Sequence, residues 1–161
     1  MRRFMSAVYG IDVTLHAISA VTLAFMIVVT LLDVIMRNLG HPIVGGVEII
    51  SFSGSVVIGF AIPYASWKRA HVYVDLVVEK LSPRNKKIMA VVTRCMGITL
   101  FAFMGYNFIV YGRDLLRTGE VSAGFRLPYY PIAFGLSFSC FIQSITLFCD
   151  LLRPAKGENN E

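Results

Sequence analysis

Three ionisable side chains between residues 68 and 87 are spaced so that one helix face would carry all of them. His71, Asp75 and Glu79 follow one another at intervals of four, and we expect a short amphipathic helix over residues 72–81. An imidazole and two carboxylates on one face could bind a metal ion or relay a proton. The other interpretation is a solvated polar face on a helix that lies at a membrane surface. We favour this second interpretation, because one exposed helix face encloses a metal ion poorly.

The acidic residues outside this segment lie near the ends of long apolar runs. Asp12, Asp33, Glu48 and Asp150 are all placed where we expect a helix to begin or end, and the others fall in loops or in the tail. An ion-coupled carrier needs acidic or polar ligands near the middle of its membrane helices. We therefore expect no ion-coupling site in this chain.

The three histidines do not suggest a cofactor site either. A haem b group needs axial ligands, usually histidine, at matched depth on facing helices. His16 lies near the start of the first apolar run, His41 lies between two runs, and His71 lies in the charged segment. The chain also has no nucleophile elbow, no Gly-rich phosphate loop and no paired catalytic carboxylates. We predict no cofactor and no enzymatic activity, and expect the chain to serve a partner.

Four apolar runs must position these groups, and they determine the fold class. The chain has 161 residues, of which 56% are hydrophobic and 16% charged, whereas about a quarter are charged in a soluble domain. A run of about 20 apolar residues crosses about 30 Å of hydrocarbon as a helix. Such helices are expected at residues 13–32, 48–67, 88–111 and 128–152. The first run is too long for the apolar region of a signal peptide, and no cleavage site follows it.

The sequence thus predicts an all-α integral membrane protein with four transmembrane helices. We expect one membrane domain over residues 1–152 and a polar tail over residues 153–161. The short amphipathic helix would lie in the loop between the second and third membrane helices.

Lysines and arginines are distributed unevenly around these helices. Basic residues beside membrane helices are retained on the cytoplasmic side, and the central loop carries six of the fifteen. With both termini inside, the outer side keeps only Arg37, Arg113, Arg117 and Arg126. The cytoplasmic side then holds Arg2, Arg3, Lys68, Arg69, Lys80, Arg84, Lys86, Lys87, Arg153 and Lys156. We predict an N-in, C-in topology, with the net charge of +5 facing anionic lipids rather than nucleic acid.

Two charged groups within the helices have structural interpretations. Asp33 and Arg37 lie one turn apart and are expected to pair. Arg94 lies seven residues after Lys87, about 10 Å along the third helix. A charge inside the membrane marks a functional site by default, but an arginine at this depth can reach the cytoplasmic headgroups or bind a structural partner. We favour the structural role.

Small residues recur along the second helix. Ser51, Ser55 and Gly59 are spaced every fourth residue, and such a stripe lets another helix approach closely. Chance placement of small residues is the alternative. We predict that this stripe packs against a partner helix.

The order and spacing of several motifs resemble one transporter family. The motifs are Arg37, Glu48, the segment WKRAHVYVD (residues 67–75), Gly119-Glu120 and Leu127-Pro128. The segment contains Trp67, Arg69, His71 and Asp75, which match the family's cytoplasmic-loop motif. The chain resembles the small integral-membrane subunit of tripartite ATP-independent periplasmic (TRAP) transporters over nearly its whole length. It departs from the family at Gly45-Gly46-Val47, where members often carry a tryptophan.

The resemblance implies a role in sodium-driven uptake of an organic acid across a bacterial inner membrane. In that family a periplasmic solute-binding protein delivers the solute, and a large permease subunit carries the solute and sodium sites. The small subunit braces the large one and contributes to the docking surface for the binding protein. Two alternatives remain at this point: a haem- or quinone-associated anchor subunit of a respiratory enzyme, and a small transporter that acts alone.

The expected outer side gathers charges where a binding protein would dock. These charges are Arg37, Glu48, Arg113, Arg117, Glu120 and Arg126. They could be solvated groups that mark helix ends, or they could form ion pairs that steer the binding protein.

Overall fold

Four long helices make up the part of the chain described by the structure. In this computed structural model the described residues are 2–41, 43–67 and 83–152. The helices are α1 (Arg2–Asn38), α2 (Gly46–Trp67), α4 (Pro83–Thr118) and α5 (Tyr130–Leu152). Each contains a stretch long and apolar enough to cross a membrane, which confirms the predicted all-helical class with four membrane helices.

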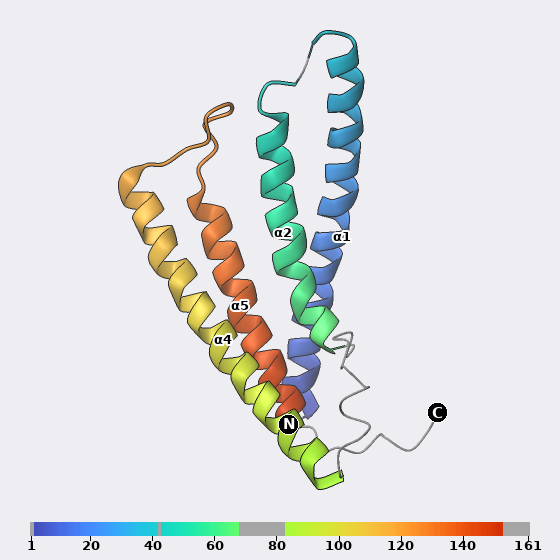
Figure 1. The fold of residues 1–161 in the computed structure, drawn as a ribbon, viewed down its shortest axis with the longest axis vertical. Helices are drawn as coiled ribbons and strands as arrows, with labels where there is room; N and C mark the ends of the chain where they lie inside the picture. The colour runs from blue at the N-terminus through green and yellow to red at the C-terminus, as the bar shows by residue number, and fades with distance from the viewer. Residues whose placement is uncertain (1, 42, 68–82, 153–161) are drawn as a thin grey trace.

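The helices form two antiparallel hairpins that lie side by side (Figure 1). The contacts run from α1 to α2, from α2 to α5 and from α5 to α4, with fewer between α1 and α5, so α5 contacts all three other helices. The beginning of α1 and the end of α5 lie at the same end of the bundle (Figure 1). The opposite end carries the connections 39–45 and 119–129, and we call it the loop end.

Two helices are longer than their apolar runs indicated. α1 begins at Arg2 rather than near residue 13, and α4 covers Pro83–Thr118 rather than residues 88–111. At 1.5 Å per residue these helices are about 55 Å long, well beyond the 30 Å of a hydrocarbon core. Charged residues such as Arg113 and Arg117 are good helix formers, so the helices continue past the apolar stretch.

Glycines end both long helices where the loop end begins. Gly40 and Gly119 have φ angles of 80° and 66°, a left-handed conformation that glycine adopts without steric cost. The amide of Gly119 donates to the carbonyl of Leu115 at 3.1 Å, which satisfies one of the last carbonyls of α4. α5 then begins at Tyr130 with Pro131 in its first turn, where a missing N–H costs nothing.

Many apolar side chains face outward, and a set of polar side chains faces inward. Exposed apolar residues lie along every helix, for example Val21 at 70% and Ile58 at 67%. The buried polar and charged residues are Asp12, Ser19, Asp33, Ser53, Ser66, Ser122, Ser137, Ser139, Gln143 and Thr146. Such an arrangement suits a lipid bilayer. Lipid provides no hydrophobic driving force between helices, so hydrogen bonds between them contribute to their association.

Candidate functional site

The carboxylate of Glu48 holds the α4–α5 connection against the beginning of α2. It accepts hydrogen bonds from the Ser122 hydroxyl at 2.5 Å, the Gly124 amide at 2.6 Å and the Phe125 amide at 3.0 Å. Glu48 lies in the first turn of α2, where the helix dipole also favours a negative charge. We call Glu48, Ser122, Gly124, Phe125 and Gly45 the Glu48 corner.

Glycines make the close approach at this corner possible. A Cβ on Gly124 would lie 3.0 Å from the Cα of Gly45 and 3.1 Å from the Glu48 carboxylate oxygens. Gly45 has a φ of 74°, and the ring of Phe125 occupies the space that its Cβ would need. The backbone therefore turns tightly beneath a phenylalanine at this corner.

Ser122 links the two halves of the same loop. Its amide donates to the carbonyl of Leu127 at 2.9 Å, and its carbonyl accepts from the amide of Arg126 at 3.1 Å. Its hydroxyl also accepts from the Leu127 amide at 3.3 Å. Ser122 is 1% exposed, so these bonds make it the centre of a folded loop and not a solvated residue.

A second carboxylate holds the α1–α2 connection. Asp33 accepts from Arg37 at 2.8 Å, which confirms the predicted pair, and from the amide of Ile43 at 3.2 Å. Gly46 lies directly beside it, since a Cβ there would be 3.2 Å from Asp33 Oδ1. Asp33 and Glu48 thus each fix one connection at the loop end.

The remaining charges predicted for a docking face are exposed at the loop end. Arg113 and Arg117 lie on the last turns of α4, and Glu120 and Arg126 lie in the connection that follows. Among the described residues none of the three arginines forms an ion pair, whereas Arg37 pairs with Asp33. The carboxylate of Glu48 therefore bonds within the chain, whereas the charges of Arg113, Arg117 and Arg126 remain available to a partner protein.

A line of polar residues on α5 joins that helix to the other three. Ser139 donates to the carbonyl of Gly59 at 2.5 Å, and Gln143 donates to the Ser66 hydroxyl at 2.5 Å, both on α2. Thr146 donates to the Asp12 carboxylate of α1 at 3.0 Å. Asp150 pairs with Arg94 of α4 at 2.9 Å. We call Ser139, Gln143, Thr146 and Asp150, with these partners, the polar seam.

Asp12 corrects the expectation that every acid lies at a helix end. It is the eleventh residue of α1, because α1 begins at Arg2 and not near residue 13, and it is 0% exposed. Its Oδ2 accepts from Thr146, and its Oδ1 is buried with no hydrogen-bond partner among the described residues. Asp12 is therefore an enclosed carboxylate within a helix, whereas the sequence analysis placed it at a helix end.

Arg94 has the structural partner that one interpretation anticipated. Its Nε lies 2.9 Å from Asp150 Oδ2, and the two side chains are only 19% and 18% exposed. Asp150 lies near the end of α5 and Arg94 lies in the first third of α4, so the pair ties the α4–α5 hairpin together at the end opposite the loop end.

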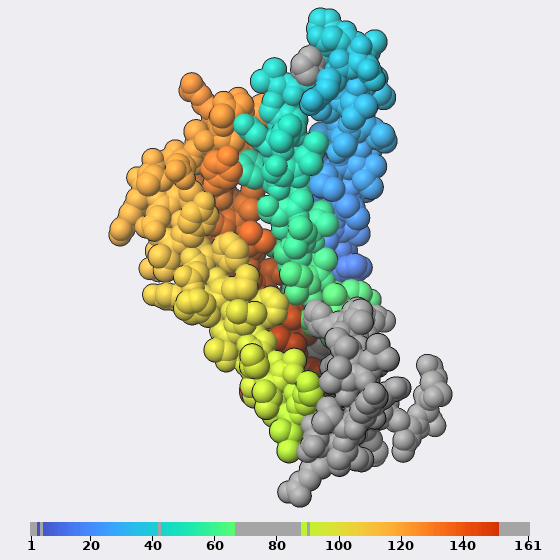
Figure 2. Space-filling view, viewed as in Figure 1, coloured from blue at the N-terminus to red at the C-terminus, as the bar shows by residue number. Residues whose placement is uncertain are grey.

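The predicted small-residue stripe divides between two environments. Ser51 is exposed, whereas Gly59 packs within the chain against Leu136 of α5. Ser55 and Gly59 also line a groove of about 290 Å³ between α2 and α4, with α5 at its bottom (Figure 2). Whether a partner helix contacts the stripe stays a prediction.

The cytoplasmic-loop motif falls mostly beyond the described residues. Arg69, His71 and Asp75, together with the expected amphipathic helix over residues 72–81, lie outside them. Trp67 is the last residue of α2.

The polar seam could have been recognised from its spacing. Ser139, Gln143, Thr146 and Asp150 are separated by four, three and four residues, which places them on one face of a helix. Partners on the other helices could not be assigned in this way, since Asp12 and Thr146 are 134 residues apart.

The fold and these sites describe a multi-pass membrane subunit whose buried polar groups join its own helices. A family model describing the DctQ component of tripartite ATP-independent periplasmic transporters matches residues 26–157. The chain therefore belongs to the family of TRAP transporter small permease subunits. No curated protein and no solved structure matched it in the corresponding comparisons.

Proposed function

We propose that this subunit braces the large permease subunit of a TRAP transporter during sodium-driven uptake of an organic acid. The observation that carries the proposal is the polar seam, in which buried hydroxyl, amide and charged groups bond across helices of the same chain. A bundle joined in this way is a rigid support, and its apolar outer faces are suited to contact another membrane protein. Membership of the family makes the respiratory-anchor and stand-alone-transporter alternatives unnecessary.

The same proposal assigns docking to the loop end. Arg113 and Arg117 at the end of α4 present positive charge there, and Arg126 adds to it on the connection that Glu48 holds in place. A fixed, charged surface favours recognition of a periplasmic solute-binding protein, because the groups that meet the partner are already ordered. Docking from outside requires that the loop end face the periplasm of a cell with an inner membrane.

Reconstitution of the transporter with and without this subunit tests the bracing role. The large subunit, the binding protein and this chain would be co-expressed, and sodium-dependent uptake into proteoliposomes measured. We expect the two membrane subunits to purify together and uptake to be lost without the small one. Full uptake by the large subunit alone would contradict the proposal.

Cysteine labelling tests the orientation. Asn85→Cys lies in the first turn of α4, and Ala123→Cys lies in the exposed part of the loop end. In a background without the native cysteines, an impermeant maleimide added to intact cells should label Ala123→Cys and spare Asn85→Cys. Ala123 is preferable to its neighbour Ser122, which is buried against Glu48. Labelling in the reverse pattern would overturn the N-in, C-in topology.

A further inference from the structure

The face of α4 that points away from α5 is not covered by the described part of the chain. α4 packs chiefly against α5 and lies at the edge of the bundle (Figure 1). Gly105 and Gly112 lie on the covered face, where phenylalanine rings of α5 pack directly against them. At about 3.6 residues per turn, the opposite face carries exposed residues at alternating spacings of four and three. We call these residues the α4 outer face: Met96, Leu100, Phe103, Asn107, Val110 and Asp114.

Asn107 places an amide group among the apolar residues of this face. Its Nδ2 donates at 2.8 Å to the carbonyl of Phe103, one turn earlier on the same helix. The second N–H of this amide and its Oδ1 have no partner among the described residues. The other side-chain amides in the apolar stretches of the described helices are Asn38, which ends α1, and Gln143, which is buried. Asn107 is therefore the one amide that faces outward within such a stretch.

The position of Asn107 along α4 places this amide inside the hydrocarbon layer. Arg94 and Arg113 are 19 residues apart, about 29 Å along the helix, which matches the thickness of about 30 Å. Asn107 lies 13 residues after Arg94 and six before Arg113, about 20 and 9 Å from these charged groups. α5 gives the same level, because Ser137 donates to the carbonyl of Gly105 and lies about 10 Å from the beginning of α5. A side chain as short as asparagine does not reach headgroups or water from there.

An accessible, unpaired amide at this depth favours a protein neighbour over lipid. Lipid tails carry neither a donor nor an acceptor, and an unpaired polar group is costly in hydrocarbon. Asparagine, glutamine, serine and threonine side chains form hydrogen bonds between membrane helices. Because Asn107 has both an N–H and an oxygen to satisfy, its best partner is a side chain that both donates and accepts.

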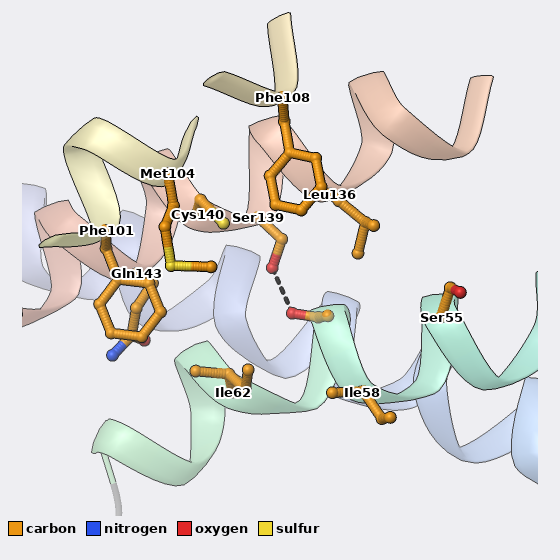
Figure 3. A pocket seen from close by; sticks show the side chains of 11 residues that line it. Ser55, Ile58, Ile62, Phe101, Met104, Phe108, Leu136, Ser139, Cys140 and Gln143 are labelled. Carbon is orange, nitrogen blue, oxygen red and sulfur yellow. Dashed lines mark hydrogen bonds between the residues drawn. The ribbon is translucent and has the colours of Figure 1, made fainter. Parts of the chain in front are cut away.

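The groove between α2 and α4 lacks such an accessible amide. The Ser139 hydroxyl donates to the carbonyl of Gly59 across the base of the groove (Figure 3). The Oε1 of Gln143 is unpaired among the described residues but fully enclosed, so no group from outside reaches it. The α4 outer face is therefore the better candidate for a polar contact with a partner.

The charge of Asp114 argues against a second copy of this chain as that partner. Copies of a membrane protein share one orientation in the bilayer, so a two-fold axis along the membrane normal would place each residue of this face beside its counterpart. Asp114 would then lie opposite Asp114, and the like charges would repel each other. A helix of a different sequence avoids this repulsion.

From these observations we infer that the α4 outer face packs against a transmembrane helix of the large permease subunit. Asn107 forms hydrogen bonds there with a serine, threonine, asparagine or glutamine side chain, and the apolar residues on either side of it are buried against the same helix. The alternating spacing of four and three suits a crossing angle of about 20°, which is common in membrane bundles. The inference rests on the proposed function, because it names the large subunit as the partner.

Removal of the amide tests the hydrogen bond. Asn107→Leu in the co-expressed complex should weaken association of the two membrane subunits about three- to tenfold. The thermal stability of the isolated subunit in detergent should not fall, because Asn107 bonds only within its own helix. Thr22→Val is the matched control, since it removes an exposed hydroxyl that bonds only to the carbonyl of Ile18 on α1. Association of Asn107→Leu at the wild-type level, or an equal loss of stability in the isolated subunit, would overturn the inference.

A bulky side chain tests the location. Val110→Trp enlarges a residue of the α4 outer face, and Val28→Trp makes the same change at an exposed position of α1. We expect at least tenfold loss of complex for Val110→Trp and little loss for Val28→Trp. Equal loss from both variants would show that the contact is not specific to α4 and would contradict the inference.

A photo-crosslinker identifies the occupant. Replacing Phe103, which is 66% exposed, with p-benzoylphenylalanine should yield a crosslink to the large subunit. The same replacement of Phe25, which is 53% exposed on α1, is the control and should not. Crosslinks between two copies of this chain, or to lipid alone, would show that the inference is wrong. Failure of the wild-type subunits to purify together would instead count against the proposed function, so the two failures can be told apart.

Discussion

The Glu48 corner and the polar seam both depend on side-chain hydrogen bonds, but their partners differ. At the corner one carboxylate accepts hydrogen bonds from two backbone amides and one hydroxyl of a loop. Along the seam, side chains bond mostly to other side chains on neighbouring helices. Loop amides have no helical carbonyl to bond, so a carboxylate can bind several, whereas helix amides are already paired.

This difference separates two tasks within one small subunit. The Glu48 corner fixes the position of a connection whose other residues are exposed, and its loss should affect the loop end locally. The polar seam joins four helices in an apolar solvent, and its loss should affect the whole bundle. Variants in the two regions can therefore be ranked by how far their effects spread.

The largest effect is expected at the Arg94–Asp150 pair. Arg94→Met removes one partner of a mostly enclosed ion pair and leaves the other charge behind, which should cost about 3 kcal/mol of unfolding free energy. Thermal unfolding in detergent measures the loss. Arg117→Met, at an exposed arginine of the same helix, is the control and should change stability by less than about 0.5 kcal/mol. Equal effects would show that the pair is held too loosely to matter.

A somewhat smaller effect is expected at Thr146. Thr146→Val keeps the shape of the side chain but removes the hydroxyl that Asp12 accepts from, which should cost about 1–3 kcal/mol. Thr14→Val removes a hydroxyl that bonds only to the carbonyl of Gly10 on its own helix, and should have little effect. The double variant Asp12→Leu with Thr146→Val should recover part of the loss, because no buried carboxylate then remains. Additive losses in the double variant would contradict a direct bond between the two residues.

Features that depend on neighbours in sequence could be predicted, and features that depend on distant residues could not. The four helices follow from apolar runs of spanning length, and the Asp33–Arg37 pair follows from a four-residue spacing. The partners of Glu48 lie 74 to 77 residues away, so its role at the corner required the folded chain.

The predicted helix ends were the other source of error. The start of α1 was placed too late, so the burial of Asp12 was not predicted. The apolar run beginning near residue 13 placed Asp12 at a boundary, but helix formation does not require apolar residues and α1 begins at Arg2. The polar face of α5 was present in the sequence as a four-three-four spacing. Uncharged hydroxyl and amide groups do not interrupt an apolar run, so this spacing alone does not show that the face is buried.

A local effect is expected at the Glu48 corner. Glu48→Gln keeps the size of the side chain but removes the charge, so the bonds to Ser122, Gly124 and Phe125 weaken. Hydrogen exchange of the Gly124 and Phe125 amides should accelerate, while exchange within α5 stays unchanged. Glu120→Gln changes an exposed carboxylate of the same loop and is the control. Acceleration throughout the bundle would mean that Glu48 holds more than the loop.

The smallest effect is expected at the exposed arginines of the loop end. Arg113 and Arg117 lie on successive turns of α4 and form no ion pair among the described residues, so their charges are available to a docking partner. Ion pairs at the rim of an interface contribute about 0.2–1 kcal/mol each and act mainly on the association rate. The double variant Arg113→Glu with Arg117→Glu should therefore raise the concentration of binding protein needed for half-maximal uptake by a modest factor, with assembly of the membrane subunits intact.

Ionic strength distinguishes docking from a structural defect in this variant. Screening acts over about 8–10 Å near physiological salt, so the difference from wild type should shrink as salt is raised. The reversal Arg37→Glu is a useful contrast, because Arg37 is already paired with Asp33 and its loss should lower the stability of the α1–α2 connection, whereas the Arg113/Arg117 reversal should leave stability unchanged. If the Arg113/Arg117 reversal leaves the half-maximal concentration unchanged at low salt, these arginines only mark the end of α4, and the docking surface must be sought elsewhere on the loop end.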